Sequence, residues 1–461
     1  MVFQERLSQY VLFSAGSFGT LQSGLNDGWT SYALPQLQSN TSVLPLTNGE
    51  GSWIASAFPI GTIVGSIILA LTLDAFGRKT MLLVGSLSFS ATWLMIVFAS
   101  STWQLVVARF IAGIFDGIVF PCVPVYIAEV ADPKIRGLLI TGTKTSYIVG
   151  IFLSNLLGAF LTITVAGTVS ALLSLGVLIC LLIPESPYFY MIKEDTEAAK
   201  TSMETYNTNC DIESIRNSLN EQKGKNGNWF ELFTDASNRK SLFLMITIKL
   251  LQQFTGFICF IFYAQTLFRE SKNDVNPIIL LSVYYLLQII VMTINGMIVD
   301  RIGRKPLLVA STSTVATALF IISVYFTLEN VTEVEVTNYS WCPVFALFLY
   351  IIGYTLGLQN IPYMIVSEIF PLHVKSAAVS IFSVVYGISS AAAAKFFQYT
   401  KDEFGMHVPF IAFFICSLCC LPVFIYLVPE TKKKTLEDIE KRIRFKHTSN
   451  DVNNASVSAK E

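Results

Sequence analysis

The sequence predicts an all-α membrane protein, with twelve transmembrane helices in two pseudo-symmetric six-helix bundles and a short cytoplasmic helical segment. Hydrophobic residues make up 53% of the chain and charged residues only 14%, which is too apolar a balance for a water-soluble protein of 461 residues. The apolar residues gather in runs long enough to cross a bilayer. A short charged motif also occurs once in each half of the chain, each time directly after such a run.

A spanning helix needs about 20 largely apolar residues, and twelve runs reach that length. They lie near residues 9–33, 52–73, 80–100, 103–128, 138–160, 163–184, 241–268, 275–299, 306–327, 341–366, 377–400 and 407–428. The first run holds Gln22, Asn26 and Asp27 and has no small-residue cleavage site. We therefore interpret it as a spanning helix and not as a removed signal peptide.

These runs divide the chain into four parts. The predicted parts are an N-terminal six-helix bundle at 1–184, a cytoplasmic helical linker at 185–240, a C-terminal six-helix bundle at 241–428 and a cytoplasmic tail at 429–461. Helical patterns in the linker and tail, TEAAKTSMETY, DIESIRNSL and TLEDIEKRIRF, predict helices that pack under the bundles, with a solvated linker as the alternative. From about residue 447 the tail is too polar to fold and is predicted to be disordered.

The basic residues predict the orientation, because cytoplasmic loops carry an excess of Lys and Arg. With the N-terminus inside, only Arg269, Lys272 and Lys401 of the 31 basic residues fall in outer loops. We expect a multi-pass plasma membrane protein with both termini in the cytoplasm. The glycosylation sequons expected outside begin at Asn40, Asn330 and Asn338, and a fourth, at Asn454, is expected to be silent.

Other compositional features exclude several classes of function. The net charge of −1 gives no reason to expect nucleic acid, and no glycine-rich phosphate loop with GK[ST] is present, so we expect no nucleotide and no primary pumping. Cys416 and Cys419 have metal-like spacing but no nearby His or further ligand set, which favours membrane packing. We expect a protein that is not an enzyme and has no cofactor or metal.

The repeated motif is LDAFGRKTM at 73–81 and VDRIGRKPL at 299–307. A single such loop could be a cytoplasmic stop anchor, but other features repeat in the same order: Glu129 and Arg136 return as Glu368 and Lys375, and Pro-Glu-Ser at 184–186 returns as Pro-Glu-Thr at 429–431. Matched six-helix halves are typical of secondary transporters, whose substrate sits at the junction of the halves.

The repeat predicts a cytoplasmic gate. In the first half, Asp74 precedes the positive end of the next helix, Gly77 permits a tight turn, and Arg78 is placed to reach Glu129. Exposed ion pairs contribute only about 0–1 kcal/mol each, which suits a latch that breaks in every cycle. The residues assigned to this gate are Asp74, Arg78, Lys79, Glu129, Arg136, Asp300, Arg304, Lys305, Glu368 and Lys375.

Several motifs together resemble the sugar porters of the major facilitator superfamily, the group of the animal glucose facilitators and the insect facilitated trehalose or hexose transporters. They are GTLQSGLNDG, DAFGRK with DRIGRK, RFIAGIFDG with PVYIAEVADPKIRG, PESP, QQFTG, IPYMIVSEIFP and PETK. The resemblance covers nearly the whole chain and implies transport of a sugar, whether a hexose, trehalose or a related polyol, by alternating access. It also implies a small-molecule partner, a monomer and facilitated diffusion, with a non-transporting sugar sensor as an alternative.

Polar residues at membrane depth mark the candidate sugar site, because they are costly there. Gln252, Gln253 and Gln288 lie near the midplane, and amides suit sugar hydroxyls because both donate and accept, although interhelical hydrogen bonds are the competing interpretation. The resemblance assigns QQFTG to sugar binding and Tyr263 to the outer gate. The further expected substrate-binding residues are Lys144, Thr355, Asn360 and Tyr363.

Departures from the family pattern alter the expected site. Two asparagines of the family, on helices 7 and 8, are replaced here by Ile258 and Gln288. Two tryptophans, on helices 10 and 11, are replaced by Tyr363 and Gly387, and a family tyrosine is replaced by Phe262. Lys144 stands where the resemblance places a sugar-binding Gln, or else it extends to the cytoplasmic water.

Charged residues within the runs form a possible intramembrane cluster of Asp27, Arg109 and Asp116. Because an unpaired buried ion is costly, we expect Asp27 or Asp116 to pair with Arg109 or Lys144, or to titrate. The resembling sugar porters that are coupled to protons carry an Asp at the position of Asn26. The Asn at this position therefore favours facilitated diffusion. Asp27 and Asp116 keep proton-coupled symport as the alternative.

Overall fold

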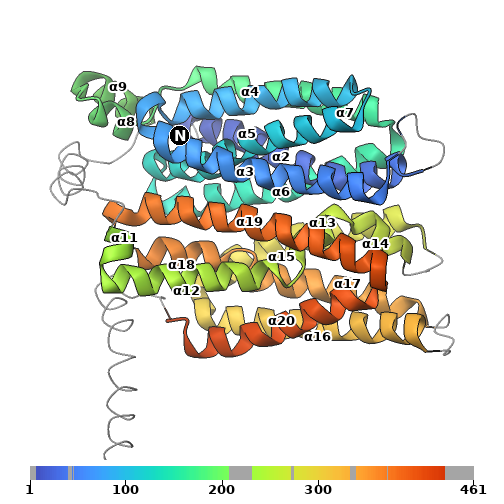
Figure 1. Ribbon diagram of the computed structural model, residues 1–461. Helices are drawn as coiled ribbons and strands as arrows, with labels where there is room; N and C mark the ends of the chain where they lie inside the picture. The colour runs from blue at the N-terminus through green and yellow to red at the C-terminus, as the bar shows by residue number, and fades with distance from the viewer. Residues whose placement is uncertain are drawn as a thin grey trace, which may run out of the picture.

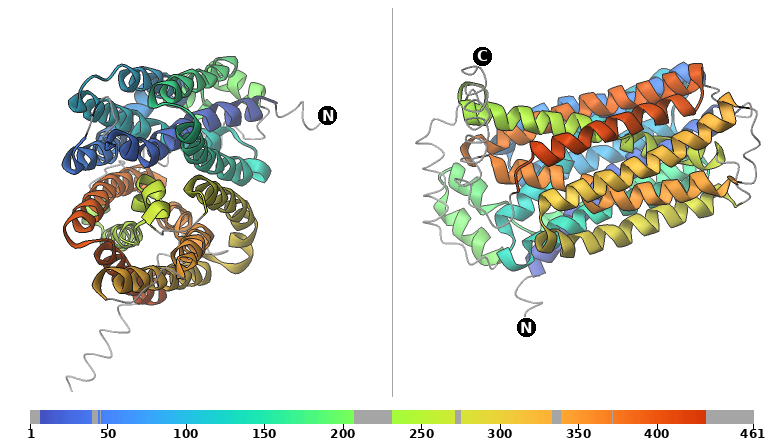
Figure 2. Two further views of the ribbon diagram at one scale, coloured as in Figure 1. Left: turned by 90° about the vertical axis from the view of Figure 1, so that its right-hand side faces the viewer. Right: turned by 90° about the horizontal axis from the view of Figure 1, so that it is seen from below.

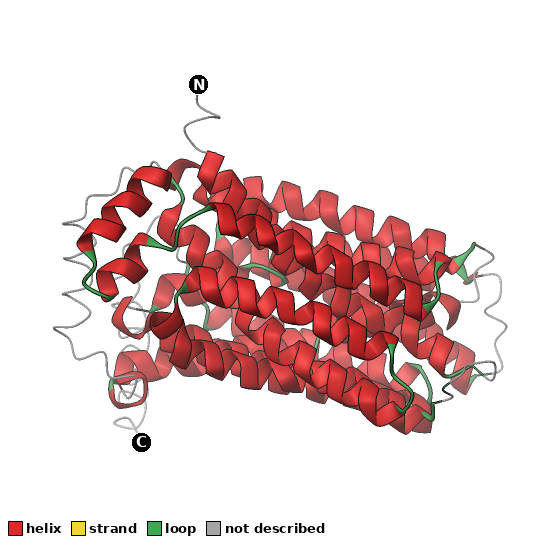
Figure 3. Ribbon diagram, turned by 90° about the horizontal axis from the view of Figure 1, so that it is seen from above, coloured by secondary structure: helices red, strands yellow, loops and turns green. Residues whose placement is uncertain are grey.

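The structure is a computed structural model, and it describes residues 7–39, 44, 46–206, 231–270, 275–332, 339–370 and 372–430. The described chain is built from helices, and no strand occurs within those ranges (Figure 3). Helices satisfy their own backbone hydrogen bonds, which is the condition for crossing a bilayer without water.

The N-terminal bundle follows the first six predicted runs. Its elements are α2 (Leu7–Leu37), α3 (Asn48–Phe76), α4 (Arg78–Val97), α5 (Thr102–Val130), α6 (Pro133–Phe160), α7 (Ile163–Ser174) and the 3-10 helix η1 (Leu175–Leu182). Two short helices follow, α8 (Pro187–Ile192) and α9 (Thr196–Tyr206). The second of them coincides with the predicted helical pattern TEAAKTSMETY.

The C-terminal bundle repeats this plan. Its elements are α11 (Glu231–Thr234), α12 (Ala236–Gln253), α13 (Phe257–Phe262), α14 (Ala264–Glu270), α15 (Pro277–Ile302), α16 (Arg304–Val331), α17 (Trp341–Gly353), the π-helix η3 (Tyr354–Leu358), α18 (Ile361–Ile369), α19 (Leu372–Phe404) and α20 (His407–Tyr426). The patterns at 211–219 and 435–445, and the tail from 447, lie outside the described residues.

The two bundles lie side by side with their helices roughly parallel (Figure 1), and the end-on view separates them clearly (Figure 2). They meet along two seams, where α3 packs against α19 and α6 packs against α15. The short helices α8, α9 and α11 lie at one end of the molecule, which we call the linker end (Figure 1). The opposite end is called the far end.

Eleven helical segments within the described residues are long and apolar enough to cross a membrane. The helix α2 is outside that set because polar residues, including Gln9, Gln22, Asn26 and Asp27, lower its hydropathy. At 31 residues α2 is still about 46 Å long, more than the thickness of the hydrocarbon core. Those four side chains are buried, so α2 lies inside the protein with little contact to lipid.

Besides the run 163–184, which passes from α7 into the 3-10 helix η1, two predicted runs, 241–268 and 341–366, are not single helices. The first breaks after Gln253, where Gly256 has a φ of +93°, a left-handed conformation that glycine adopts without strain. The second passes through the π-helix Tyr354–Leu358 before α18 begins. Continuous hydropathy hides such breaks, and interrupted helices near the midplane are where transporters of this architecture place their substrate sites.

Glycines permit the closest helix contacts in the N-terminal bundle. A Cβ on Gly65 of α3 would clash with the carbonyl oxygen of Ile114 in α5, so any side chain there must push the two helices apart. Gly137 of α6 is exposed and has nothing within 4 Å of the position that its Cβ would take.

This difference predicts opposite effects for one substitution. Gly65→Ala should lower the melting temperature, because overpacking at a close contact costs about 1–3 kcal/mol. The matched control Gly137→Ala should leave it unchanged or raise it, since Ala is the better helix former by about 1 kcal/mol. Thermal unfolding of the purified variants in detergent measures both, and an unchanged melting temperature for Gly65→Ala would contradict the described packing.

Candidate functional site

The turn between α3 and α4 is closed by a carboxylate from a distant part of the chain. Glu185, which follows η1, accepts hydrogen bonds from the backbone N–H of Arg78 at 3.0 Å and of Lys79 at 2.8 Å. These N–H groups belong to the first turn of α4, where the helix has no internal acceptors and its dipole is positive. Gly77 has a φ of +89°, and a Cβ there would collide with this carboxylate.

The Arg78 side chain links three helices of the same bundle. Its guanidinium lies 2.9 Å from the carboxylate of Asp74 in α3 and 3.0 Å from that of Glu129 in α5. Glu129 also accepts a short hydrogen bond from the Ser186 hydroxyl, just before α8. The predicted contact between Arg78 and Glu129 is therefore confirmed, and the cluster joins α3, α4, α5 and the start of α8.

Lys79 and Arg136 donate to backbone carbonyl oxygens and not to the carboxylates that Arg78 contacts. The Lys79 ammonium donates to the carbonyl oxygen of Ile183 at 2.6 Å and so satisfies the end of η1. Arg136 turns back to the carbonyl oxygen of Ala131 at 3.1 Å and does not reach the Arg78 cluster. The assignment of Arg136 to the gate stays a prediction.

The C-terminal bundle repeats the backbone part of this arrangement. Glu430 accepts hydrogen bonds from the backbone N–H of Arg304 at 3.1 Å and of Lys305 at 3.0 Å, at the start of α16. Gly303 has a φ of +109° at the same turn. The side chains of Asp300, Glu368 and Lys375 lie outside the described residues.

Asp74 is not the acceptor of the first backbone N–H groups of α4. Asp74 belongs to the last turn of α3, and its side chain is 68% exposed. The anion at the start of α4 is Glu185, and its counterpart at α16 is Glu430. Both were visible in the sequence as repeated Pro-Glu pairs, but only the fold shows that their carboxylates meet these helix ends.

The polar groups near the midplane gather around the breaks in the C-terminal bundle. The Gln252 amide donates to the Tyr354 hydroxyl at 3.1 Å and to the Leu358 carbonyl oxygen at 2.5 Å, both in η3, and accepts from the Lys249 ammonium at 3.0 Å. Gln252 therefore ties the end of α12 to the π-helix, which is the structural role that the sequence left open for it.

The other predicted amides are also hydrogen-bonded. Gln253 donates a short hydrogen bond to the Ser390 hydroxyl in α19, and Gln288 donates to Gln359 at 3.3 Å. The Gln252, Gln253 and Gln288 side chains are each about 1% exposed. The amide groups hold α12, α15, η3 and α19 together around one polar interior.

Among the remaining predicted residues, Lys144 reaches from one bundle to the other. Lys144 of α6 donates to the Asn360 side-chain oxygen at 3.4 Å, across the junction between the bundles. Thr355 accepts from Asn295 through its carbonyl oxygen at 2.9 Å, while its hydroxyl has no partner. The structure thus brings Lys144, Asn360 and Tyr363 together, with the Lys144 ammonium 5.3 Å from the centre of the Tyr363 ring.

At the far end the bundles are in direct contact. The helices α13 and α14 pack against α2, and the Gln265 backbone N–H donates to the Ser31 hydroxyl at 3.1 Å. Tyr263, predicted at the outer gate, is buried between α13 and α14 with its ring 5.0 Å from that of Phe397. These contacts close the far end of the junction in this structure.

The expected ion pair between an intramembrane carboxylate and Arg109 or Lys144 does not form within the described residues. Arg109 donates to the Asn26 carbonyl oxygen at 2.7 Å and the Thr30 hydroxyl at 3.1 Å, and it stacks 4.5 Å from the Phe58 ring centre. Asp27 accepts from the Tyr147 hydroxyl at 2.7 Å. Neutral partners and aromatic faces satisfy these charges, which sequence spacing alone does not indicate.

Several buried polar atoms near the junction lack a protein partner. Among the described residues these atoms include the side-chain oxygens of Asn26, Asp116, Asn295, Thr355 and Tyr285. Leaving such a group unpaired costs about 1–3 kcal/mol, so a polar ligand or water in the junction would gain by satisfying them.

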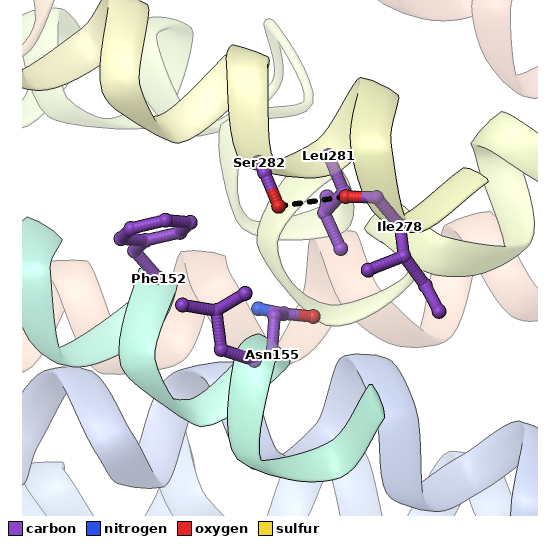
Figure 4. A pocket seen from close by; sticks show the side chains of 6 residues that line it. Phe152, Asn155, Ile278, Leu281 and Ser282 are labelled. Atoms are coloured by element: carbon purple, nitrogen blue, oxygen red, sulfur yellow. Dashed lines mark hydrogen bonds between the residues drawn. The ribbon is translucent and has the colours of Figure 1, made fainter. Parts of the chain in front are cut away.

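A crevice between α6 and α15 lies at one seam of the bundles. It is lined by Phe152, Asn155, Leu156, Ile278, Leu281 and Ser282 (Figure 4). Asn155 is eleven residues beyond Lys144 on α6, a separation of about 16 Å along the helix. The crevice is therefore distinct from the polar interior around Gln252.

Sequence reasoning missed Lys249, which lies three residues before the predicted Gln252. The side chain is about 1% exposed and is surrounded by the rings of Tyr363, Phe382 and Tyr386. Its position in a spanning run, next to two glutamines, was the signal that could have found it.

Of the three expected glycosylation sites, Asn40 and Asn338 lie outside the described residues. Asn330 is exposed in the last turn of α16, at the far end. The three sites therefore stay predictions.

The role of Glu185 predicts a specific loss of stability. Glu185→Ala should lower the melting temperature by removing the acceptor of the N–H groups of Arg78, Lys79 and Ser186, each worth about 1–3 kcal/mol when buried and unpaired. Glu197→Ala is the control, because that exposed carboxylate should change stability by less than about 0.5 kcal/mol. Equal melting temperatures for the two variants in detergent would exclude this role.

Comparison with solved structures identifies the fold. The chain superposes on the major facilitator superfamily proton:xylose symporter XylE bound to 6-bromo-6-deoxy-D-glucose with a TM-score of 0.78 and 18% identity, over 94% of this chain and 98% of that one. The partially occluded inward-open conformation of the E. coli xylose transporter XylE matches equally well, with a TM-score of 0.78 over 93% and 100% of the two chains. The predicted twelve-helix major facilitator fold is thus confirmed.

Sequence comparison identifies the family. A facilitated trehalose transporter, Tret1, of Bombyx mori is 28% identical over 95% of this chain and 87% of its own length. The Tret1 protein of Apis mellifera ligustica is 28% identical over 93% of this chain and 86% of its own length. Residues 12–442 match the model of the sugar (and other) transporter family. The chain belongs to that family of membrane transporters.

Proposed function

We propose that the chain moves a sugar across the plasma membrane by alternating access and facilitated diffusion, as a monomer with its linker end in the cytoplasm. The observation that carries this proposal is the polar junction between two six-helix bundles, where Lys144 of one bundle meets Asn360 of the other. Unpartnered oxygens near that junction can accept hydrogen bonds from sugar hydroxyls. The relatives named above are facilitated trehalose transporters, so trehalose and hexoses are the first substrates to test.

The charged cluster at the linker end supports a part in the transport cycle. Within the described residues, the partners of Arg78 belong to the N-terminal bundle, so this cluster braces that bundle. We assign to it the role of holding α4, α5 and α8 as one unit while the bundles rotate. The symmetric turn at Glu430 and Arg304 would do the same for the C-terminal bundle.

Proton-coupled symport is the second candidate, and Asp27 and Asp116 favour it. Both carboxylates are buried in spanning helices, and Asp116 has an oxygen without a partner. Asn26 stands at the position where the resemblance places the coupling Asp. Its amide does not bind and release a proton near neutral pH, which favours diffusion. Asp27 accepts a hydrogen bond from the Tyr147 hydroxyl.

Uptake into proteoliposomes tests the function and the coupling together. Labelled glucose and trehalose, among a panel of sugars, should equilibrate across the membrane without exceeding the outside concentration, with or without a pH gradient. Gln253→Ala should slow uptake at normal folding, because its amide lies in the polar interior. Accumulation driven by the pH gradient would contradict facilitated diffusion and favour symport. Absence of uptake for every sugar in the panel would overturn the proposed function.

A further inference from the structure

Lys249 is a buried lysine that has no anionic partner among the described residues. Its ammonium donates to the Gln252 side-chain oxygen at 3.0 Å and to the Tyr363 hydroxyl at 3.4 Å. It also lies 4.6 to 4.9 Å from the ring centres of Tyr363, Phe382 and Tyr386. These neutral groups and aromatic faces hold the charge in place, and they do not neutralise it.

Lys144 approaches the same tyrosine from the other bundle. Its ammonium lies 5.3 Å from the centre of the Tyr363 ring, and its hydrogen bond to Asn360 is long, at 3.4 Å. Lys144 is partly exposed at the junction, and both ammonium groups lie within 5.3 Å of the Tyr363 ring centre, so two positive charges there repel each other. No carboxylate of the described residues lies within ion-pair distance of either lysine.

The nearest carboxylates are engaged elsewhere. Asp27 of α2 accepts a hydrogen bond from Tyr147, and Asp116 is buried in α5 of the N-terminal bundle. Both carboxylates interact electrostatically with Arg109, which lies deep within the N-terminal bundle. When all five of these side chains are ionised, they carry three positive charges against two negative ones, and the excess positive charge lies at the junction between the bundles.

An excess positive charge at membrane depth favours a specific class of ligand. A buried ion costs several kcal/mol unless a counter-ion compensates it. Two like charges on opposite bundles also push the bundles apart at the point where a substrate must draw them together. A single negative charge placed between the lysines would remove both penalties.

We propose that the transported sugar is anionic, and that its acidic group binds between Lys144 and Lys249 beside the Tyr363 ring. This inference rests on the proposed function, because it assigns the substrate class of the same site. The hydroxyls of the sugar would meet Asn360, Gln288 and the unpartnered oxygens, while the acidic group links one bundle to the other. A carboxylate of a sugar acid and the phosphate of a sugar phosphate share this chemistry.

A purely structural role for Lys249 is the competing explanation. In that case the three rings and Gln252 satisfy the ammonium permanently, and the site takes uncharged sugars. The two explanations differ in what happens to substrate choice, and in the charge carried across the membrane per transport cycle.

The first experiment uses the unaltered protein in proteoliposomes with labelled glucose, glucuronate and glucose 6-phosphate. A membrane potential, positive inside, is imposed without a pH gradient. Glucuronate uptake should exceed glucose uptake, and at 100 mV a carried monoanion should accumulate up to about 50-fold. Uncharged glucose should only equilibrate. Preference for glucose 6-phosphate over glucuronate would assign the acidic group to a phosphate, and preference for glucuronate would assign it to a carboxylate.

The second experiment removes the charges. Lys249→Met and Lys144→Met should each slow uptake of the preferred anion by about 30-fold or more, the loss expected when one partner of a buried charge pair is removed. Lys249→Arg should retain more uptake than Lys249→Met, because it keeps the charge. Lys240→Met is the matched control, since Lys240 is an exposed residue of the same helix, α12.

The outcomes separate this inference from the proposed function. Uptake of glucose or trehalose that is insensitive to potential, with no transport of or competition by either acidic sugar, would overturn the anionic substrate and leave sugar transport standing. Competition measurements on the unaltered protein keep this test valid even when a lysine variant fails to fold. Absence of uptake for all sugars, neutral and acidic, would overturn the proposed function as well.

Discussion

Every backbone polar group within a bilayer must find its partner inside the protein, and this constraint governs the structure described here. At the linker end, Glu185 and Glu430 supply acceptors to the first backbone N–H groups of α4 and α16. In the interior, Gln252 bridges the broken ends of α12 and the π-helix, where backbone groups are not all satisfied within a regular helix. The charged motifs and the interior amides are two solutions to the same requirement.

Sequence reasoning predicted the architecture because hydropathy reports directly on membrane helices. The twelve runs correspond to helices, the repeated motif marks equivalent turns, and Arg78 contacts Glu129 as expected. The first helix, α2, was identified despite its polar residues, because the run that contains them is long and most of its other residues are apolar. These features depend on composition and spacing, which the sequence contains in full.

Sequence reasoning was less successful with side-chain partners. Hydropathy shows neither the left-handed turn at Gly256 nor the π-helix, so the runs 241–268 and 341–366 were expected to be unbroken. Arg136 and Asp74 were placed by charge and proximity along the chain, while the actual partner choice depends on where Ala131 and Glu185 lie in three dimensions. Lys249 was missed because its significance comes from three rings on α18 and α19.

The central claim is that the two bundles rotate about the polar junction, so that one end opens as the other closes. Two distances between spin labels on α6 and α15 test this rotation. One label pair, at the exposed positions Leu138 and Ile302, reports on the linker end, and the other, at the exposed positions Phe160 and Ile279, reports on the far end. On addition of a transported sugar in lipid, the account predicts that the two distance distributions shift in opposite directions. Distances that stay fixed, or that lengthen or shorten together, would contradict it.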